Sequence, residues 1–362
     1  TYVHRAPPCQ GSCPSGEDIR GWLNIVRGIE KPPADTAWQK YAFERVTDAN
    51  PFPAIMGRVC PAPCEDGCNR NEVEDHVGIN AVEQFIGDYG LEHDLKLHPP
   101  GPDTGKKVAI IGSGVAGLAC AYHLRRMGHA CTVFEKQEKL GGMMRYGIPG
   151  YRVPDKVLDG EIQRIIDLGV EIRNKTRIGE DISFDELRSQ FDAVFIALGA
   201  QSGMALPVPG GDAPNVISGV AFLQAFNDGR LQHTAGKVLV VGGGDTSMDV
   251  AAVARRLGHI EHKREHDRPE NIIMGYMAHD VAGVAQRQGA EVVLISRESS
   301  DIMPATKMEV EHVTQEGVSI RPGLLPVEVL LGEDGRARGV RVIQTDWSSG
   351  KMETVEGTET EI

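Results

Sequence analysis

The sequence has no excess of positive charge, no long apolar run and no two cysteines spaced as C-x-x-C. Its formal net charge of −13 over 362 residues argues against a nucleic-acid surface, because binding phosphates requires a positive field. No apolar run approaches the roughly 18 residues of a membrane-spanning helix, and no signal peptide is visible at Thr1. The missing C-x-x-C argues against a dithiol active site. We therefore expect a cytoplasmic protein without dithiol chemistry.

The cysteines are unevenly distributed in an otherwise ordinary globular composition, with 41% apolar and 25% charged residues. A chain of this length usually forms two or three domains. Cys120 and Cys131 fall inside an alternating strand and helix pattern, where we expect them to be small core residues. In a cytosolic protein, clustered cysteines suggest metal before disulfides. The five clustered cysteines are Cys9, Cys13, Cys60, Cys64 and Cys68.

The strongest motif is a predicted strand, glycine turn and helix over residues 107–124. Gly112, Gly114 and Gly117 fit G-x-G-x-x-G, in which the glycines allow a tight turn, close approach of a pyrophosphate and close packing of helix on strand. A second strand ends at Glu135, which we expect to accept a hydrogen bond from a ribose hydroxyl of an adenine dinucleotide. The alternative is a glycine turn that only joins strand to helix.

A second unit of the same kind begins at residue 236 and carries three consecutive glycines at 242–244. Two such units predict two dinucleotides. Roughly thirty extra residues precede its next strand, 291–297. The inserted segment, 260–279, could be a lid or a partner contact, and a tolerated surface insertion explains it equally well. Histidines in and beside it could hold a metal, although solvated surface histidines are commoner; they are His259, His262 and His266.

The remaining patterns divide the chain. Before about residue 100 there is no strand alternation, and helices are expected from a capping-box-like start at Ser15 to about residue 26 and from 79 to 89. A proline and glycine linker covers 97–105, and an α/β alternation follows. A hairpin is expected over 327–343, and the chain stops at Ile362 in an apparent strand lead-in.

These motifs resemble the small (β) subunit of NADPH-dependent glutamate synthase, the flavin-containing part of dihydropyrimidine dehydrogenase and the large subunit of electron-bifurcating transhydrogenase. The resemblance runs from Pro8 to Ile362 and rests on C-Q-G-S-C-P at 9–14, G-R-V-C-P-A-P-C-E-D-G-C at 57–68, G-G-M-M-R-Y-G-I-P at 141–149, Y-R-V-P at 151–154 and G-G-G-D-T at 242–246. It implies an α/β protein in which a helical iron–sulfur domain precedes two Rossmann-like domains, one for FAD and one, inserted into it, for NAD(P)H. The implied domains are 1–100 (iron–sulfur), 101–232 (FAD, first segment), 233–325 (NAD(P)) and 326–362 (return to the FAD domain, apparently truncated).

The resemblance also assigns iron ligands. Cys13, Cys60 and Cys64 match three ligands of one four-iron cluster, and Glu83 occupies the family's non-cysteine fourth position. Cys9 and Cys68 match ligands of a second cluster, whose other two ligands come in the family from an upstream C-x-x-C that nothing before Cys9 supplies. Iron–sulfur clusters prefer cysteine thiolates independently of the resemblance. Zinc is the alternative, although this spacing does not obviously form its tetrahedral sets.

For the two dinucleotides, the resemblance assigns residues around both glycine turns. The FAD matches are Gly112, Ser113, Gly114, Ala116, Gly117, Glu135, Lys136, Gly142 and Arg152. The family completes this site with a late strand followed by Gly-Asp, which is not found before Ile362. Either the chain is truncated or flavin binding is incomplete, and truncation is favoured. The NAD(P)H matches are Gly242, Gly243, Gly244, Asp245 and Thr246. Where NADPH-using relatives carry paired arginines, this chain has Arg297-Glu298, which makes NADH a serious possibility.

The expected function is an NAD(P)H-dependent electron-transfer subunit of a larger oxidoreductase. Hydride would pass between nicotinamide and FAD, and electrons would pass through iron–sulfur to or from a partner subunit or ferredoxin. The alternatives are a self-contained flavin disulfide reductase, which the cysteine spacing disfavours, and a zinc-stabilised docking module with a vestigial nucleotide fold. The sequence does not name the terminal acceptor.

Overall fold

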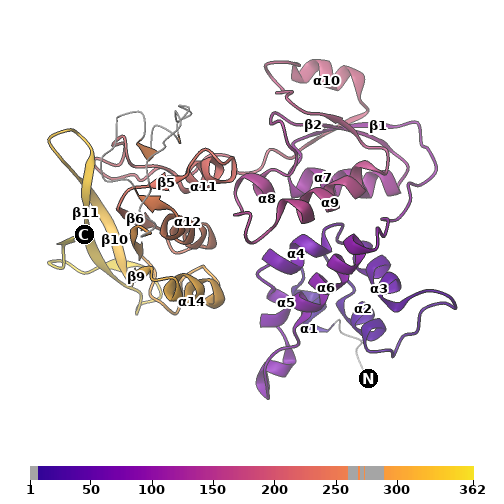
Figure 1. Cartoon of the computed structure of the whole chain (residues 1–362), viewed down its shortest axis with the longest axis horizontal. Coiled ribbons are helices and arrows are strands. Elements are labelled where there is room, and N and C mark those ends of the chain that lie inside the picture. The colour runs from indigo at the N-terminus through magenta and orange to yellow at the C-terminus, as the bar shows by residue number, and fades with distance from the viewer. Residues whose placement is uncertain (1–6, 260–267, 270–272, 274–288) are drawn as a thin grey trace. The chain divides into compact units, whose positions relative to one another are not determined.

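The computed structural model describes residues 7–259, 268–269, 273 and 289–362 (Figure 1). The chain forms two compact units, one of residues 1–145 and 150–199 and one of residues 146–149 and 200–362. The predicted insertion at 260–279 lies outside the described residues apart from 268, 269 and 273, as do His262, His266 and the side chain of His259.

The first unit begins with a helical part built on a small apolar core. Trp22, Phe43, Ile55 and Ile86 are fully buried in it. Its elements are α1 (Pro8–Ser12), α2 (Ile19–Val26), α3 (Trp38–Thr47), α4 (Pro53–Val59), α5 (Pro63–Asp66), the 3-10 helix η1 (Asn69–Glu72) and α6 (Ile79–Glu92). The helix expected from residue 79 is confirmed.

The expected helix ending near residue 26 does form, but its expected start at Ser15 is wrong. Helix α2 begins at Ile19, because the carboxylate of Asp18 caps it by accepting a hydrogen bond from the Gly21 amide at 3.1 Å. Gly16 has a φ of 68°, a left-handed conformation that breaks any helix begun at residue 15. Asp18, which the sequence pattern placed three residues inside the helix, is therefore the N-cap residue itself.

A four-stranded parallel sheet forms the rest of the first unit, in the order β3-β2-β1-β4. The strands are β1 (Lys107–Ile111), β2 (Ala130–Phe134), β3 (Glu171–Arg173) and β4 (Ala193–Ile196). Helices α7 (Val115–Arg126) and α9 (Asp155–Ile166) lie on one face and α10 (Phe184–Gln190) lies on the other, as Figure 1 shows. The short helix α8 (Met143–Tyr146) precedes α9. Helices on both faces make the sheet doubly wound, as the sequence predicts.

The helical part packs on α7 and α9, so the cysteine-bearing segments and the first glycine turn belong to one compact unit. The buried hydroxyl of Tyr122 on α7 donates to the carbonyl of Thr47 at 2.6 Å. On α9, the buried carboxylate of Glu161 accepts hydrogen bonds from two amides of α4.

The second unit repeats the strand, turn and helix arrangement. Strands β6 (Lys237–Val241), β8 (Glu291–Ser296) and β9 (Ser319–Pro322) form a parallel sheet in that order. Val240, Val292 and Leu294 point to one face, where α11 (Gly219–Asn227), α12 (Asp245–Arg256) and α14 (Lys307–Gln315) pack. Strands β5 (His233–Thr234) and β7 (Gly258–His259) form a separate short pair.

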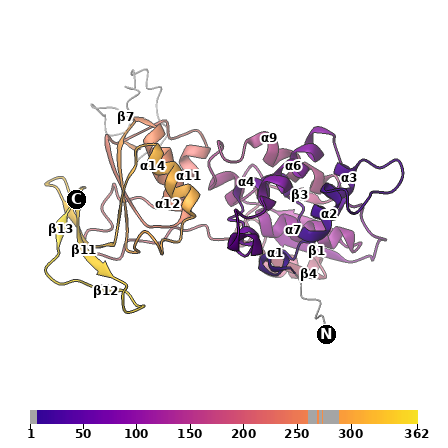
Figure 2. The ribbon, with the colours of Figure 1, turned by 90° about the horizontal axis from the view of Figure 1, so that it is seen from below.

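The predicted hairpin covers the other face of this sheet and is confirmed. Strands β10 (Leu324–Leu331) and β11 (Ala337–Asp346) pair around a turn in which Gly335 has a φ of 72°. An apolar cluster between the hairpin and the sheet contains Val329 of β10, Val340 of β11 and Ile295 of β8. Strands β12 (Glu353–Thr354) and β13 (Thr360–Glu361) pair with β11 (Figure 2). The hairpin packs within the second unit; the four-part division of the chain, including a return of residues 326–362 to the FAD domain, stays a prediction.

Candidate cofactor sites

The first glycine turn has no room for a side chain at two of its glycines and has room at the third. A Cβ atom on Gly112, which has a φ of 107°, would lie 2.3 Å from the Ala197 carbonyl oxygen, and one on Gly117 would lie 1.9 Å from the Gly112 carbonyl oxygen. At Gly114 nothing is nearer than the Gly142 Cα at 3.9 Å. No side chain of the described residues caps α7, so its first amides can face a phosphate. The turn therefore has the shape that a pyrophosphate requires.

Glu135 lies against this turn, 6% exposed. Its Oε2 accepts hydrogen bonds from the amide and hydroxyl of Ser113, at 3.0 and 2.6 Å, and its Oε1 accepts one from the Gln137 amide at 2.9 Å. A carboxylate oxygen can accept two hydrogen bonds, so Oε1 retains capacity for a ribose hydroxyl. Glu135 therefore lies beside the first glycine turn, and its Oε1 can accept one further hydrogen bond.

The segment before α8 contacts the same turn. The Gly141 amide donates to the Ser113 carbonyl at 3.1 Å, and a Cβ on Gly142 would lie 2.7 Å from the Gly114 Cα. Arg145, which sequence reasoning missed, is 9% exposed and forms ion pairs with Asp155 and Asp159 that tie α8 to α9. Of the other predicted FAD residues, Ala116 lies in the first turn of α7, Lys136 follows Glu135, and Arg152 lies between α8 and α9.

The second glycine turn repeats this geometry. Gly242 has a φ of 136°, a Cβ on Gly243 would lie 2.4 Å from the Ser296 hydroxyl oxygen, and nothing lies within 4 Å of a Cβ on Gly244. Asp245 begins α12 and accepts a hydrogen bond from the Thr306 amide at 3.2 Å. Thr246 follows in the first turn of the helix. The open glycine again lies at a helix start without a side-chain cap from the described residues.

Glu298 occupies the place beside the second turn that Glu135 occupies beside the first. Its Oε2 accepts a hydrogen bond from the Ser296 hydroxyl at 2.8 Å and would lie 3.3 Å from a Cβ on Gly243. Its Oε1 accepts one from Nε of Arg297 at 2.8 Å. Burial alone would raise the pKa of Glu298, but the hydrogen bonds from Arg297 and Ser296 outweigh it and hold the pKa below its usual value. The acid is therefore ionised at neutral pH and engages the neighbouring arginine.

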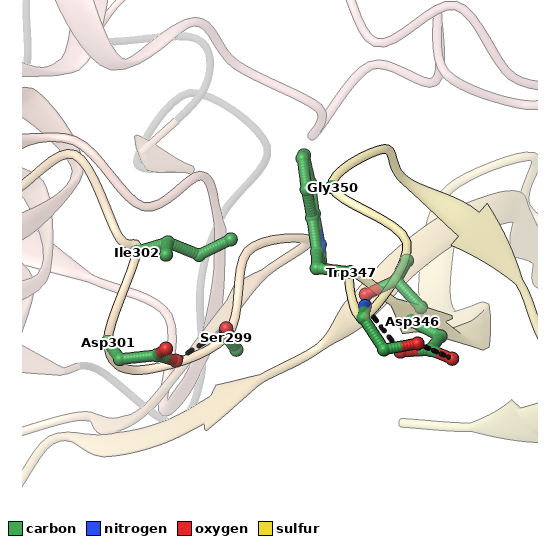
Figure 3. A pocket seen from close by; sticks show the side chains of 8 residues that line it. Ser299, Asp301, Ile302, Asp346, Trp347 and Gly350 are labelled. Carbon is green, nitrogen blue, oxygen red and sulfur yellow. Dashed lines mark hydrogen bonds between the residues drawn. The ribbon is translucent and has the colours of Figure 1, made fainter.

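A pocket of about 460 Å³ lies beside Arg297 (Figure 3). Its wall is fixed by β11 and the residues after it, because Nε1 of Trp347 and Oγ1 of Thr345 both donate to the Arg297 carbonyl, at 2.9 and 2.6 Å. No sequence motif indicated that this turn would meet the end of β8. The lining residues are Ser299, Asp301, Ile302, Thr345, Asp346, Trp347, Ser348 and Gly350.

The pocket combines apolar walls with acidic edges. The indole of Trp347 and the side chain of Ile302 line it from different segments, as Figure 3 shows. The carboxylates of Asp301 and Asp346 belong to the same lining. Such a pocket suits a flat, uncharged ring better than an anionic group.

The five clustered cysteines lie at the ends of short helices. Cys9 is in α1 and Cys13 follows it, Cys60 follows α4, Cys64 is in α5, and Cys68 precedes η1. Helices α1 and α5 are in contact, since a Cβ on Gly67 would lie 2.6 Å from the Ser12 hydroxyl oxygen. None of the seven cysteines forms a disulfide.

The electrostatic neighbours of these thiols are mostly other members of the cluster, and Cys13 is a neighbour of Cys9, Cys60 and Cys64. The pKa of Cys64 is raised to about 12, first by burial and then by the nearby charges of Glu65, Cys60 and Cys13. Burial also raises the pKa of Cys60, with Glu83 and Cys13 among the contributing charges. A separate thiol, Cys9, has its pKa raised by burial and then by Cys68 and Cys13. Thiols held protonated in this way need a cation before they ionise.

Two buried carboxylates complete the surroundings of Cys60. Glu83 is 7% exposed, and its Oε1 accepts a hydrogen bond from Nδ2 of Asn50 at 2.6 Å. Glu17 is 5% exposed, and its buried Oε2 has no hydrogen-bond partner among the described residues. Burial raises the pKa of Glu17 to about 7 and also raises that of Glu83, whose charge is close to Glu17. Two neighbouring buried carboxyl groups ionise together only when a positive group is supplied, so these residues can accommodate an iron-containing group. Within the described residues, no three His, Cys, Asp or Glu side chains converge as they would around a single metal ion.

Comparison with known proteins identifies the family. Residues 106–355 match the pyridine nucleotide-disulphide oxidoreductase family, and residues 4–95 match the domain described as dihydropyrimidine dehydrogenase domain II, 4Fe-4S cluster. The chain therefore belongs to the pyridine nucleotide-disulphide oxidoreductases. Its cofactors are those of the matched families, namely FAD, NAD(P)H and a 4Fe-4S cluster, as the sequence predicts.

Two relatives and one solved structure illustrate the likeness. The chain is 35% identical over 357 residues to the NADPH-Fe(3+) oxidoreductase subunit beta of Geobacter sulfurreducens, covering 94% of this chain and 47% of that protein. It is 33% identical over 374 residues to the glutamate synthase [NADPH] small chain of Mycobacterium tuberculosis, covering 98% and 70%. Mycobacterium tuberculosis FprA in complex with NADPH has a TM-score of 0.56 at 18% identity, covering 72% of this chain and 69% of that chain, which shows a shared fold.

These comparisons confirm the resemblance to the glutamate synthase small subunit and the expected fold class of a helical 4Fe-4S domain followed by nucleotide-binding domains. The chain spans about half the length of relatives such as the Geobacter protein. Among the described helices, none is both long and apolar enough to cross a membrane.

Proposed function

We propose that this chain is the NAD(P)H-oxidising, flavin- and iron–sulfur-containing part of a larger cytoplasmic oxidoreductase, exchanging electrons with a partner subunit or ferredoxin. The observation that carries the proposal is the repeated geometry of the two glycine turns, each with one open glycine, a helix start without a side-chain cap and a largely buried acid beside it, buried at Glu135 and partly buried at Glu298. The cysteine-rich helical part, packed on the first of these folds, supports the electron-transfer role.

In this proposal the first turn holds FAD. The amides at the start of α7 would bind its pyrophosphate across the open Gly114, and Oε1 of Glu135 would accept a hydrogen bond from a ribose hydroxyl. Bound flavin supplies the chemistry, because it exchanges a hydride with nicotinamide and single electrons with iron–sulfur. The protein binds and orients it without a side-chain acid or base. The remaining proposed FAD residues are Gly112, Ser113, Ala116, Gly117, Lys136, Gly142 and Arg152.

The cluster site in this proposal is the group of buried thiols and carboxylates around Cys60. Cys13, Cys60 and Cys64 would hold one 4Fe-4S cluster together with Glu83, because Cys60 has both Cys13 and Glu83 as charged neighbours and Cys64 has Cys60 and Cys13. Cys9 and Cys68 form a second pair of neighbouring thiols, available to a second cluster.

The second turn holds the nicotinamide cofactor, through Gly242, Gly243, Gly244, Asp245 and Thr246. We propose that its adenine enters the pocket between Trp347 and Ile302 and that its ribose hydroxyls bind Glu298. This arrangement favours NADH, because a 2′-phosphate would lie near an ionised Glu298 whose carboxylate already engages Arg297.

The test is the visible spectrum and dye reduction of the whole protein purified under anaerobic conditions. Flavin and iron–sulfur absorb visible light, whereas zinc does not. We expect a coloured protein that reduces an artificial dye with NADH or NADPH. A colourless, zinc-containing protein without this activity would favour the docking module, and reduction of a disulfide substrate without iron would favour the disulfide reductase.

A further inference from the structure

We propose that Glu161, in helix α9 of the first nucleotide-binding fold, is a positioning residue for the iron–sulfur cluster, because it holds the helix that ends at Cys60. The inference rests on the proposed function, in which cluster and flavin exchange electrons. Neither the glycine turns nor the cysteine spacing indicates a role for this residue.

Helix α4 takes its N-terminal cap from Glu161. The residue before the helix, Phe52, provides no side-chain cap, and Pro53 begins the first turn. Glu161 Oε1 accepts a hydrogen bond from the Ala54 amide at 2.8 Å, and Oε2 accepts one from the Ile55 amide at 3.0 Å. Because one fully buried carboxylate binds two consecutive amides, it fixes both the position and the direction of this helix end.

The other end of α4 carries the predicted ligand. Cys60 is the residue after the helix, and its amide donates to the Met56 carbonyl at 2.8 Å. The helix has seven residues and therefore spans about 10 Å at 1.5 Å per residue. A helix this short moves as a rigid element, so a displacement at its capped end is transmitted to Cys60.

Helix α4 also controls the position of the predicted oxygen ligand. A Cβ on Gly57 would lie 2.4 Å from the Gln84 amide nitrogen, and a Cβ on Gly87 would lie 2.2 Å from the Ala54 amide nitrogen. The backbones of α4 and α6 are therefore in direct contact at two points. Since Glu83 adjoins Gln84 on α6, the two helices carry a thiol and a carboxylate ligand as one body.

A second charged residue of α9 enters the helical part beside Glu161. The guanidinium of Arg164 lies 4.0 Å from the Glu161 carboxylate and 4.9 Å from the centre of the Phe43 ring. Its Nη atoms are buried, with no hydrogen-bond partner among the described residues. Buried ion pairs contribute little net stability compared with apolar packing. Stabilising the contact between α9 and the helical part therefore does not by itself explain why Glu161 and Arg164 are buried there. The directional cap on α4 does.

The experiment compares Glu161→Gln and Glu161→Ala in the whole protein, with Gln163→Ala as the matched control. Gln163 lies on the same helix, and its side chain is exposed and bonds only to Asp167 among the described residues. Each protein is assayed for FAD content, NADH-driven dye reduction, iron content, the EPR spectrum of the reduced cluster, and the rate at which NADH bleaches the cluster in stopped flow.

We expect the control to behave as wild type. Glu161→Gln, which can accept only one of the two amide hydrogen bonds through its oxygen, should keep wild-type FAD content and dye reduction while shifting the EPR spectrum. It should also slow cluster reduction by roughly tenfold to a hundredfold, the upper figure being the effect expected from a group misplaced by about 1 Å. Glu161→Ala, which accepts neither bond, should show a larger shift and slower reduction.

Wild-type EPR spectra and wild-type bleaching rates in Glu161→Gln, at full iron content, would overturn the inference even if Glu161→Ala fails to fold. Equal loss of FAD binding and cluster reduction would also overturn it, because that pattern indicates general unfolding. Failure of the proposed function is distinguishable, since it appears in the wild-type protein as absent flavin or absent dye reduction.

Discussion

Gly114 is the residue at which the first glycine turn leaves room that the chain does not fill. A Cβ there would meet nothing nearer than Gly142 Cα, at 3.9 Å. We therefore expect Gly114→Leu to fold but to lose FAD, because its side chain would occupy the approach of the pyrophosphate. Flavin absorbance per protein after gel filtration measures the loss. As a control, Gly78→Leu changes an equally open position and should retain FAD. Full retention of FAD by Gly114→Leu would show that the pyrophosphate does not bind at this turn.

Arg297 and Glu298 are expected to set the choice between NADH and NADPH. Glu298→Arg should shift the preference towards NADPH by tenfold or more, since reversing a partly desolvated charge near a phosphate is worth a few kcal/mol. Arg297→Ala should weaken NADPH use more than NADH use, because the arginine is the cation of the pair. The measurement is the ratio of kcat/KM for the two cofactors. Unchanged ratios in both variants would show that the residues at the end of β8 do not bind the ribose.

Trp347 is expected to stack on the adenine of the nicotinamide cofactor. Base stacking on an aromatic side chain is worth about 1–3 kcal/mol, so Trp347→Ala should weaken NADH binding roughly tenfold. NADH should also quench the indole emission of the wild-type protein. Trp347→Phe should remove most of that quenching, whereas Trp38→Phe, in the helical part, should leave it. Equal quenching in both variants would exclude adenine from this pocket.

At the scale of elements, both strand–turn–helix units could be predicted because their signals are local. Gly112 and Gly242 lie at positive φ, and buried strands precede them. Contacts between distant segments could not be predicted in this way. The β11 end meets the Arg297 carbonyl through Trp347, about fifty residues along the chain, and no periodicity encodes that meeting. The start of α2 was missed because a nearer acid, Asp18, provides the cap.

The helices that carry cysteines divide them into ligands and core residues. Cys60 follows α4 and Cys64 lies in α5, whereas Cys131 lies in β2, buried against the Ala121 carbonyl of α7, and Cys120 is on that helix. We expect Cys60→Ser and Cys64→Ser each to lower the iron content, because thiolates hold the cluster. Cys120→Ser and Cys131→Ser should leave iron per protein unchanged. Equal iron loss from all four variants would contradict the assignment.

At the scale of the whole molecule, each compact unit carries one proposed dinucleotide site, and the first also carries the cysteines. Within that first unit, the helical part meets the nucleotide-binding fold through polar contacts. Tyr122 donates to the Thr47 carbonyl, Arg126 pairs with Asp48 at 2.8 Å, and Glu161 caps α4. Because Glu161 is a buried titratable group in this contact, the free energy of unfolding should depend on pH. A substitution of Glu161 isolates its share of that dependence.

Burial raises the pKa of Glu161 from 4.5 to about 7, and the amides of Ala54 and Ile55 and the charges of Arg164 and Arg58 only partly oppose this. Between these values the folded protein binds more protons than the unfolded chain, so the stability from this group is present below pH 4.5 and is lost as pH rises through 7. The full shift corresponds to about 3 kcal/mol. Denaturant unfolding at pH 5, 6, 7 and 8 should therefore show the stability of wild type falling relative to Glu161→Gln as pH rises. The charge of Glu161 also raises the pKa of Glu83, so the difference reports Glu161 together with its effect on Glu83. A pH-independent difference would show that Glu161 keeps its charge through the whole range.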